Sequence, residues 1–231
     1  MLGADLREIA STADVAFLPA FPSLFSIINP IGGALIFNIY TRGFARAVRL
    51  DLAKWVGFYS LLVMFGALWG GTYVLSFFGV SIDALRIAGG TVVALSGWQL
   101  LTSGEQHPDR KHGQEAAAED AESDPLQLAF FPLTLPFTTG PGTIAVAITL
   151  GAVRPPVHFG LAPFFIGVSL AAVANAAIIW IAYRFADRVT GLIGATARLV
   201  VVRLSAFLLM AIGVQILVTA IGDLVMKWRV V

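Results

Sequence analysis

FPSLFSIINPIGG, residues 21–33, interrupts a long apolar segment near its middle, and a degenerate copy, FPLTLPFTTGPGT, interrupts another at residues 131–143. An apolar helix in lipid has no water to satisfy the backbone groups that a Pro or Gly break sets free. Such a break is therefore tolerated only where protein buries it or where it lines a cavity. The two copies predict a membrane protein with two paired breaks in its interior.

Composition agrees with a membrane protein. The 231-residue chain is 58% hydrophobic and 13% charged, whereas soluble domains are about half apolar and about a quarter charged. Its formal charge of +1 gives no indication of a nucleic-acid partner. The lack of cysteine excludes disulfides, thiolate metal sites and cysteine nucleophiles. We expect one integral membrane domain with no cofactor and no metal site.

Six apolar stretches have the length of about 20 residues that a bilayer crossing needs. They are residues 15–40, 54–78, 82–102, 126–151, 159–183 and 199–224. The predicted fold class is an all-α polytopic bundle of six transmembrane helices, of which the first and fourth are broken. Residues 103–125 between the third and fourth stretches are acidic and polar. For His107 and His112 in that stretch, the polar composition favours a solvated linker over a metal site.

An internal repeat divides the six stretches into three plus three. RIAGG at residues 86–90 and GWQ at 97–99 are echoed by RLSA at 203–206 and GVQ at 213–215. Three spans in each half would make the second half enter the membrane from the opposite side. Residues 15–102 and 126–224 are therefore predicted to be inverted repeats, an architecture typical of secondary transporters with a site at the bilayer midplane.

Each break predicts the start of a half-helix. Asn29 suits the N-cap position and Pro30 the first helical position, and Thr139 or Gly140 with Pro141 repeats the arrangement. Inverted repeats would bring the two N-terminal ends together near the midplane, where their partial positive charge suits a carboxylate. Freed carbonyls and nearby hydroxyls could bind an ammonium group or a coupling ion, and a zwitterionic solute fits this pairing. The alternative is that the prolines are kinks that only shape the bundle.

The predicted substrate-binding residues come from both copies of the break. They are Ser26, Asn29, Pro30, Gly32, Gly33, Thr138, Thr139, Gly140, Pro141, Gly142 and Thr143. Gln99, Asn175 and Gln215 lie inside apolar stretches, where they either hydrogen-bond between helices or line a pathway. No Asp, Glu, Lys or Arg lies near the middle of a span, so the coupling ion, proton or sodium, stays open. The spans also lack a pair of acidic residues or a Ser/Lys pair that could act in catalysis, which disfavours an intramembrane enzyme.

Lys and Arg are unevenly divided between alternate connections. Ten lie on the side that follows the first, third and fifth stretches, and five lie on the other side. The positive-inside rule then places residues 103–125 in the cytoplasm and both termini outside it.

Three motifs carry a resemblance to a known family. They are the Phe-Pro…Asn-Pro-Ile-Gly pattern, the Pro-Phe-Thr-Thr-Gly-Pro-Gly-Thr-Ile pattern and the Arg-Ile-Ala-Gly-Gly pattern. With them the chain resembles the MarC family of six-span inner-membrane proteins over nearly its whole length. The resemblance implies transport of small neutral amino acids, such as glycine or alanine, across the inner membrane. The alternatives are a membrane scaffold that does not transport and an exporter of other small molecules; oligomeric state is left open.

Overall fold

The computed structural model describes residues 2–102, 125–152, 161–188 and 195–229, which are helical apart from short turns and breaks. The helices in chain order are α1 (Leu2–Ile28), α2 (Pro30–Thr41), α3 (Arg46–Phe65), η1 (Gly66–Gly70), α4 (Gly71–Phe78), α5 (Ile82–Thr102), α7 (Pro125–Leu128), η2 (Ala129–Thr138), α8 (Pro141–Ala152), α9 (Leu161–Arg184) and α11 (Ala195–Arg229). The turns of η1 are wider than those of an α-helix, as in a π-helix, whereas η2 is interrupted by non-helical dihedral angles at Phe131 and Leu135. Within the described ranges there is no strand, which confirms the predicted all-α fold.

Four stretches are long and apolar enough to cross a membrane: Ala13–Thr41, Arg46–Phe78, Leu161–Arg184 and Val202–Trp228. The bent pair Leu126–Thr138 and Pro141–Ala152 makes a fifth if it counts as one span. Helix α5 has 21 residues and is therefore about 31 Å long. It is not among these spans. The count of six spans stays a prediction.

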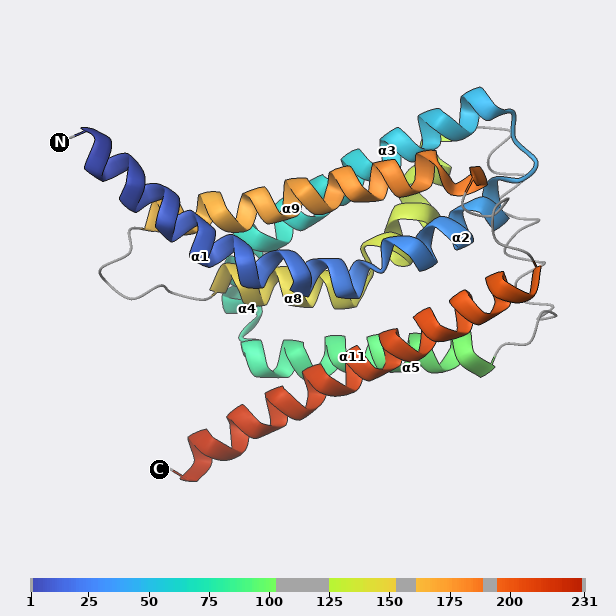
Figure 1. Cartoon of the computed structure of the whole chain (residues 1–231). Coiled ribbons are helices and arrows are strands. Elements are labelled where there is room, and N and C mark those ends of the chain that lie inside the picture. The colour runs from blue at the N-terminus through green and yellow to red at the C-terminus, as the bar shows by residue number, and fades with distance from the viewer. Residues whose placement is uncertain (1, 103–124, 153–160, 189–194, 230–231) are drawn as a thin grey trace.

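The helices lie roughly along one common axis, and both chain termini lie at the same end of the bundle (Figure 1). We call this end the terminal end. Helices α2, α5 and α9 finish at the opposite end, which we call the linker end (Figure 1). Helix α3 begins there at Arg46, eight residues before the predicted apolar stretch, because its polar first turns extend the helix beyond the apolar part.

The main core lies among α1, α2, α3, η1, η2, α8 and α9. Its large buried side chains include Leu24, Phe37, Leu52, Leu68 and Ile179. Many apolar side chains of the outer surface are exposed, among them those of α4 and of α11. An exposed apolar surface of this extent is what a bundle in contact with lipid needs.

Helices α5 and α11 pack along each other as a separate layer (Figure 1). Glycines bring the two backbones together: a Cβ added to Gly97 would collide with the backbone of Met210, and one added to Gly213 would collide with that of Ala94. Small residues allow such close approach where lipid supplies no hydrophobic drive for helices to pair. This pair contacts the rest of the bundle mainly where α5 meets α8.

Candidate functional site

Asn29 separates α1 from α2 in the first copy of the break. Its backbone is left-handed, with φ 47° and ψ 65°, a conformation that Asn adopts more readily than most residues. Its side-chain oxygen accepts a hydrogen bond from the N–H of Gly32 at 3.2 Å, and Pro30 is the first residue of α2. The predicted Asn-Pro cap is confirmed. The two halves remain aligned closely enough to form one span, Ala13–Thr41.

Thr139 and Gly140 separate η2 from α8 in the second copy. The carbonyl of Gly140 accepts a hydrogen bond from the N–H of Ile144 at 3.1 Å, and α8 begins at Pro141 as predicted. Helix α8 is turned by 71° from the segment before it. Phe131 and Leu135, which each precede a proline, also leave helical dihedral angles, so this copy is interrupted at more positions than the first.

The first turn of α8 has no side-chain cap. Gly140 offers no side chain, and the hydroxyl of Thr139 donates to the carbonyl of Thr134 at 3.3 Å. In the described part of the chain no acceptor is bonded to the N–H of Gly142 or Thr143. The positive end of α2 is therefore met by the Asn29 oxygen, whereas that of α8 is left without a partner.

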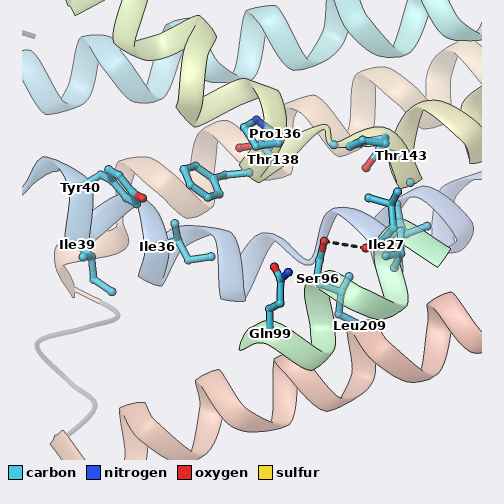
Figure 2. A pocket seen from close by; sticks show the side chains of 16 residues that line it. Ile27, Ile36, Ile39, Tyr40, Ser96, Gln99, Pro136, Thr138, Thr143 and Leu209 are labelled. Atoms are coloured by element: carbon cyan, nitrogen blue, oxygen red, sulfur yellow. Dashed lines mark hydrogen bonds between the residues drawn. The ribbon is translucent and has the colours of Figure 1, made fainter. Parts of the chain in front are cut away.

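A cavity of 390 Å³ lies between α2, α5 and the break before α8 (Figure 2). It is lined by Ile27, Ile36, Ile39, Tyr40, Val92, Val93, Ser96, Gln99, Pro136, Phe137, Thr138, Gly140, Pro141, Gly142, Thr143 and Leu209. It extends from the start of α8 along the later turns of α2 and α5, toward the linker end. Its volume is at the small end of the about 300–1,000 Å³ of ligand pockets.

The predicted site residues divide unequally around this cavity. Those that line it are Gln99, Thr138, Gly140, Pro141, Gly142 and Thr143. Those that do not are Ser26, Asn29, Pro30, Gly32, Gly33, Thr139, Asn175 and Gln215. The cavity thus brings together residues of the second copy and one predicted pathway residue.

Tyr183 of α9 closes off the first copy. Its hydroxyl lies 2.7 Å from that of Thr138, which in turn donates to the carbonyl of Leu133 at 2.6 Å. A Cβ added to Gly33 would collide with the Tyr183 hydroxyl. The first turn of α2 is therefore packed against α9 instead of facing the cavity.

Two predicted pathway residues make contacts elsewhere. The buried Asn175 amide donates to the carbonyl of Ala171 at 2.9 Å and to that of Phe21, on α1, at 3.3 Å. The exposed Gln215 amide donates to Thr219 on the same helix at 3.3 Å. Asn175 therefore connects two helices, which was the alternative to a pathway role.

Thr143 differs from the neighbouring threonines. Its side chain is only 3% exposed and lines the cavity. No hydrogen bond joins its hydroxyl to any of the residues that the structure describes. Figure 2 places Thr143 across the cavity from Ser96 and Gln99. This hydroxyl is therefore available to a ligand in the cavity.

Sequence reasoning missed most of the apolar wall and two polar residues, Tyr40 and Ser96. Ser96 donates to the carbonyl of Val92 at 2.8 Å, an ordinary contact for a helical serine. The signal that could have found it is spacing: Val92, Ser96 and Gln99 recur every three to four residues and so share one face of α5. Tyr40 carried no comparable signal.

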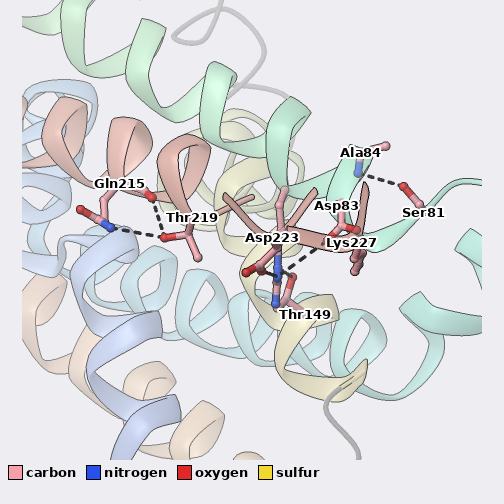
Figure 3. A network of polar contacts seen from close by, with 9 residues as sticks. Ser81, Asp83, Ala84, Thr149, Gln215, Thr219, Asp223 and Lys227 are labelled. Carbon is pink, nitrogen blue, oxygen red and sulfur yellow. Dashed lines mark hydrogen bonds and ion pairs between the residues drawn. The ribbon is translucent and has the colours of Figure 1, made fainter. Parts of the chain in front are cut away.

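A polar network joins α5, α8 and α11 at the terminal end (Figure 3). Arg86 donates to the carboxylate of Asp223 at 3.0 Å and to the hydroxyl of Thr149 at 3.4 Å. Asp83 is paired with Lys227. At the linker end, Asp187, which follows the end of α9, is paired with Arg49 and accepts a hydrogen bond from Asn38 of α2 at 2.8 Å. Each end of the bundle is thus tied by its own set of polar contacts.

The sequence matches the MarC family of integral membrane proteins over residues 15–225, which includes every residue that lines the cavity. The chain belongs to this family. It is 30% identical over 208 residues to the UPF0056 inner membrane protein MarC of Citrobacter koseri, which covers 89% of this chain and 94% of the relative. The MarC proteins of Salmonella paratyphi A and Escherichia coli O1:K1 are each 29% identical over 207 residues, with the same coverage.

These relatives are named inner membrane proteins, and the apolar helices of this MarC family member fit a multi-pass protein of that membrane. No solved structure matches the chain. His107, His112 and nearly all of the predicted linker lie outside the described residues. Elsewhere, the structure brings no three His, Asp or Glu residues together in a way that could hold a metal ion.

Proposed function

We propose that this MarC family protein is a secondary transporter of small neutral amino acids or similar small zwitterionic solutes, and that it works by alternating access across the inner membrane. The observation that carries the proposal is the cavity at the start of α8. A helix break within a membrane bundle exposes backbone donors there, beside a space of 390 Å³. A coupling ion, proton or sodium, would drive the transport.

Packing supports the inverted repeat that this mechanism needs. Helix α3 packs on α9 and α5 packs on α11, so that each unbroken segment lies beside its counterpart. The two broken segments also contact each other: the first half of one lies against the second half of the other, since α1 contacts α8 and α2 contacts η2. Helices α2 and α8 begin near mid-depth and run toward opposite ends (Figure 1). In this proposal α5 is the third of six spans, and it is shielded from lipid along α11.

The contacts around the cavity indicate which state of the transport cycle the structure describes. On the terminal side of the cavity, α5 and α8 are in close contact, and a Cβ on Gly89 would meet the Cβ of Ala145. On the linker side, α2 and α5 are separated by the cavity. The state described is therefore one that opens toward the linker end, and the other state would close α2 onto the α5–α11 pair.

The test is uptake of labelled alanine and leucine into proteoliposomes under a proton or a sodium gradient. We expect saturable uptake, and we expect Thr143→Val to reduce it at least about tenfold because a hydroxyl in contact with a charged group is lost. The control is Thr91→Val, since Thr91 is exposed and bonds only to the carbonyl of Ile87 on its own helix. Uptake that is no faster than in empty liposomes under either gradient would reject the proposed function.

Orientation is part of the proposal: the linker end faces the cytoplasm and both termini lie outside it. The chain has no cysteine, so single cysteines can be introduced directly. Val80→Cys in the turn after α4 should react with a membrane-impermeant thiol reagent added to intact cells. Gly43→Cys in the turn after α2 should react only after the cells are opened. The reverse pattern would invert the orientation.

A further inference from the structure

Recognition in the cavity is one-sided, because only one of the two half-helix starts is available to a ligand. The start of α2 is capped by Asn29 and packed on Tyr183, and neither residue lines the cavity. At the start of α8 the cavity is lined by Gly142 and Thr143. Their two N–H groups and the Thr143 hydroxyl have no acceptor among the described residues.

Three donors of this kind match a single carboxylate. An uncapped helix start carries about half a positive charge and favours an anion. The Thr143 hydroxyl is a separate indication of a ligand, since it belongs to a residue that is only 3% exposed, lines the cavity and bonds through its hydroxyl to none of the described residues. Thr138 cannot act in the same way, because its hydroxyl already donates to Leu133.

The rest of the cavity favours an apolar group and has no carboxylate that could pair with an ammonium group. None of the residues that line it carries a charge. Next to the start of α8 the wall is aliphatic: a Cβ on Gly142 would collide with the Val93 side chain and come within 3.6 Å of Ile27. The wall continues with Ile36, Ile39, Val92 and Leu209. An ammonium group would have to rely on neutral acceptors such as the Gln99 amide.

We propose that the cavity is a binding site for monocarboxylates with an apolar chain of about the size of a leucine side chain, in which the carboxylate lies on the first turn of α8 and the ammonium group is dispensable. This inference rests on the proposed function and narrows its substrate class. Branched apolar amino acids are zwitterionic members of this class. Glycine has no side chain to contact the apolar wall of the cavity. Dicarboxylates and cationic solutes would bring a charge for which the cavity has no partner.

Equilibrium binding of labelled 4-methylpentanoate to the purified full chain in detergent tests the site without requiring transport. We expect leucine to compete more weakly than the unlabelled acid, because its ammonium group would meet only neutral acceptors in the cavity. Leucinamide, which lacks the carboxylate, should be weaker by about tenfold or more because hydrogen bonds to a charged group are lost. Glycine should be weaker by a similar factor because it buries no side chain.

Thr143→Val should weaken binding of 4-methylpentanoate about tenfold, while Thr143→Ser, which keeps the hydroxyl, should bind to within about twofold of wild type. Thr91→Val is the matched control and should not change binding. Equal binding of leucinamide and leucine would overturn the carboxylate assignment, and equal binding of glycine and leucine would overturn the apolar one. The absence of saturable binding would overturn both.

A fatty acid shares the chemistry of the proposed ligand, so decanoate is a separate arm of the experiment. If decanoate bound far more tightly than 4-methylpentanoate, the cavity would be a lipid groove and the proposal would be wrong. The outcome also separates this inference from the proposed function. The expected binding series without any uptake would reject transport and keep the site, whereas equal uptake of alanine and leucine would keep transport and reject the apolar preference.

Discussion

At the scale of single residues, Asn29 combines two roles that substitutions can separate. It holds a left-handed backbone and caps α2 through Gly32. Asn29→Gly can still adopt the left-handed backbone but loses the side-chain cap, which should reduce the free energy of unfolding by a few tenths of a kcal/mol. Asn29→Ala loses the cap and strains the backbone, at a cost of about 2–3 kcal/mol.

Thermal unfolding in detergent should therefore rank wild type above Asn29→Gly and Asn29→Gly above Asn29→Ala. Ser26→Ala, at an exposed position in the last turn of α1, is the control and should unfold like wild type. If the alanine and glycine variants at position 29 unfolded at the same temperature, the left-handed backbone would not contribute.

The contact between Gly33 and Tyr183 makes a second prediction at this scale. Gly33→Ala places a methyl group against the Tyr183 hydroxyl and should cost about 1–3 kcal/mol by overpacking. Tyr183→Phe removes that hydroxyl together with its hydrogen bond to Thr138. Combined with Gly33→Ala, it should recover part of the lost stability.

A double-mutant cycle of unfolding temperatures measures this coupling. Additive effects of the two substitutions would mean that α2 does not pack on Tyr183 as described. Gly43→Ala is a matched control, since a Cβ there meets no atom within 4 Å.

At the scale of elements, the α5–α11 pair depends on glycine. A Cβ on Gly97 or Gly213 would collide with the backbone of the partner helix, which cannot move aside as a side chain can. Gly213→Ala should therefore reduce the free energy of unfolding by about 1–3 kcal/mol and lower the unfolding temperature. Gly222→Ala on the same helix has open space around it and should be neutral or slightly stabilising, because alanine favours helix. Equal effects of the two substitutions would contradict the close packing.

At the scale of the whole molecule, the network of Arg86, Asp223 and Thr149 should hold the terminal end closed. Arg86 is its shared donor, to α8 and to α11. Its ion pair is partly exposed, so its loss should shift the equilibrium between states by only about 1 kcal/mol, or a few-fold.

Reaction rates of Ser96→Cys in the cavity with a membrane-impermeant thiol reagent can detect this shift. Arg86→Gln should speed the reaction from the terminal side a few-fold and slow it from the linker side. Arg46→Gln is the control, because Arg46 is exposed and takes no part in either network. If Arg86→Gln changed neither rate, the network would not act as a gate.

The sequence by itself determined the helical membrane fold, the positions of both breaks and the starts of α2 and α8. These follow from local chemistry: lipid forbids unsatisfied backbone, and the Asn-Pro and Gly-Pro pairs place a proline at the first helical position, which proline favours. The unequal capping was also present in the sequence, since Asn29 has a side-chain acceptor and Gly140 has none.

Only the tertiary structure decided which copy faces a cavity. Tyr183 lies about 150 residues after Gly33 in the sequence, yet it fills the space beside the first copy. The start of α8 instead faces Val93 and the later turns of α2 and α5. Two similar motifs therefore differ in role because long-range packing closes one and leaves the other open, and no local pattern carries that difference.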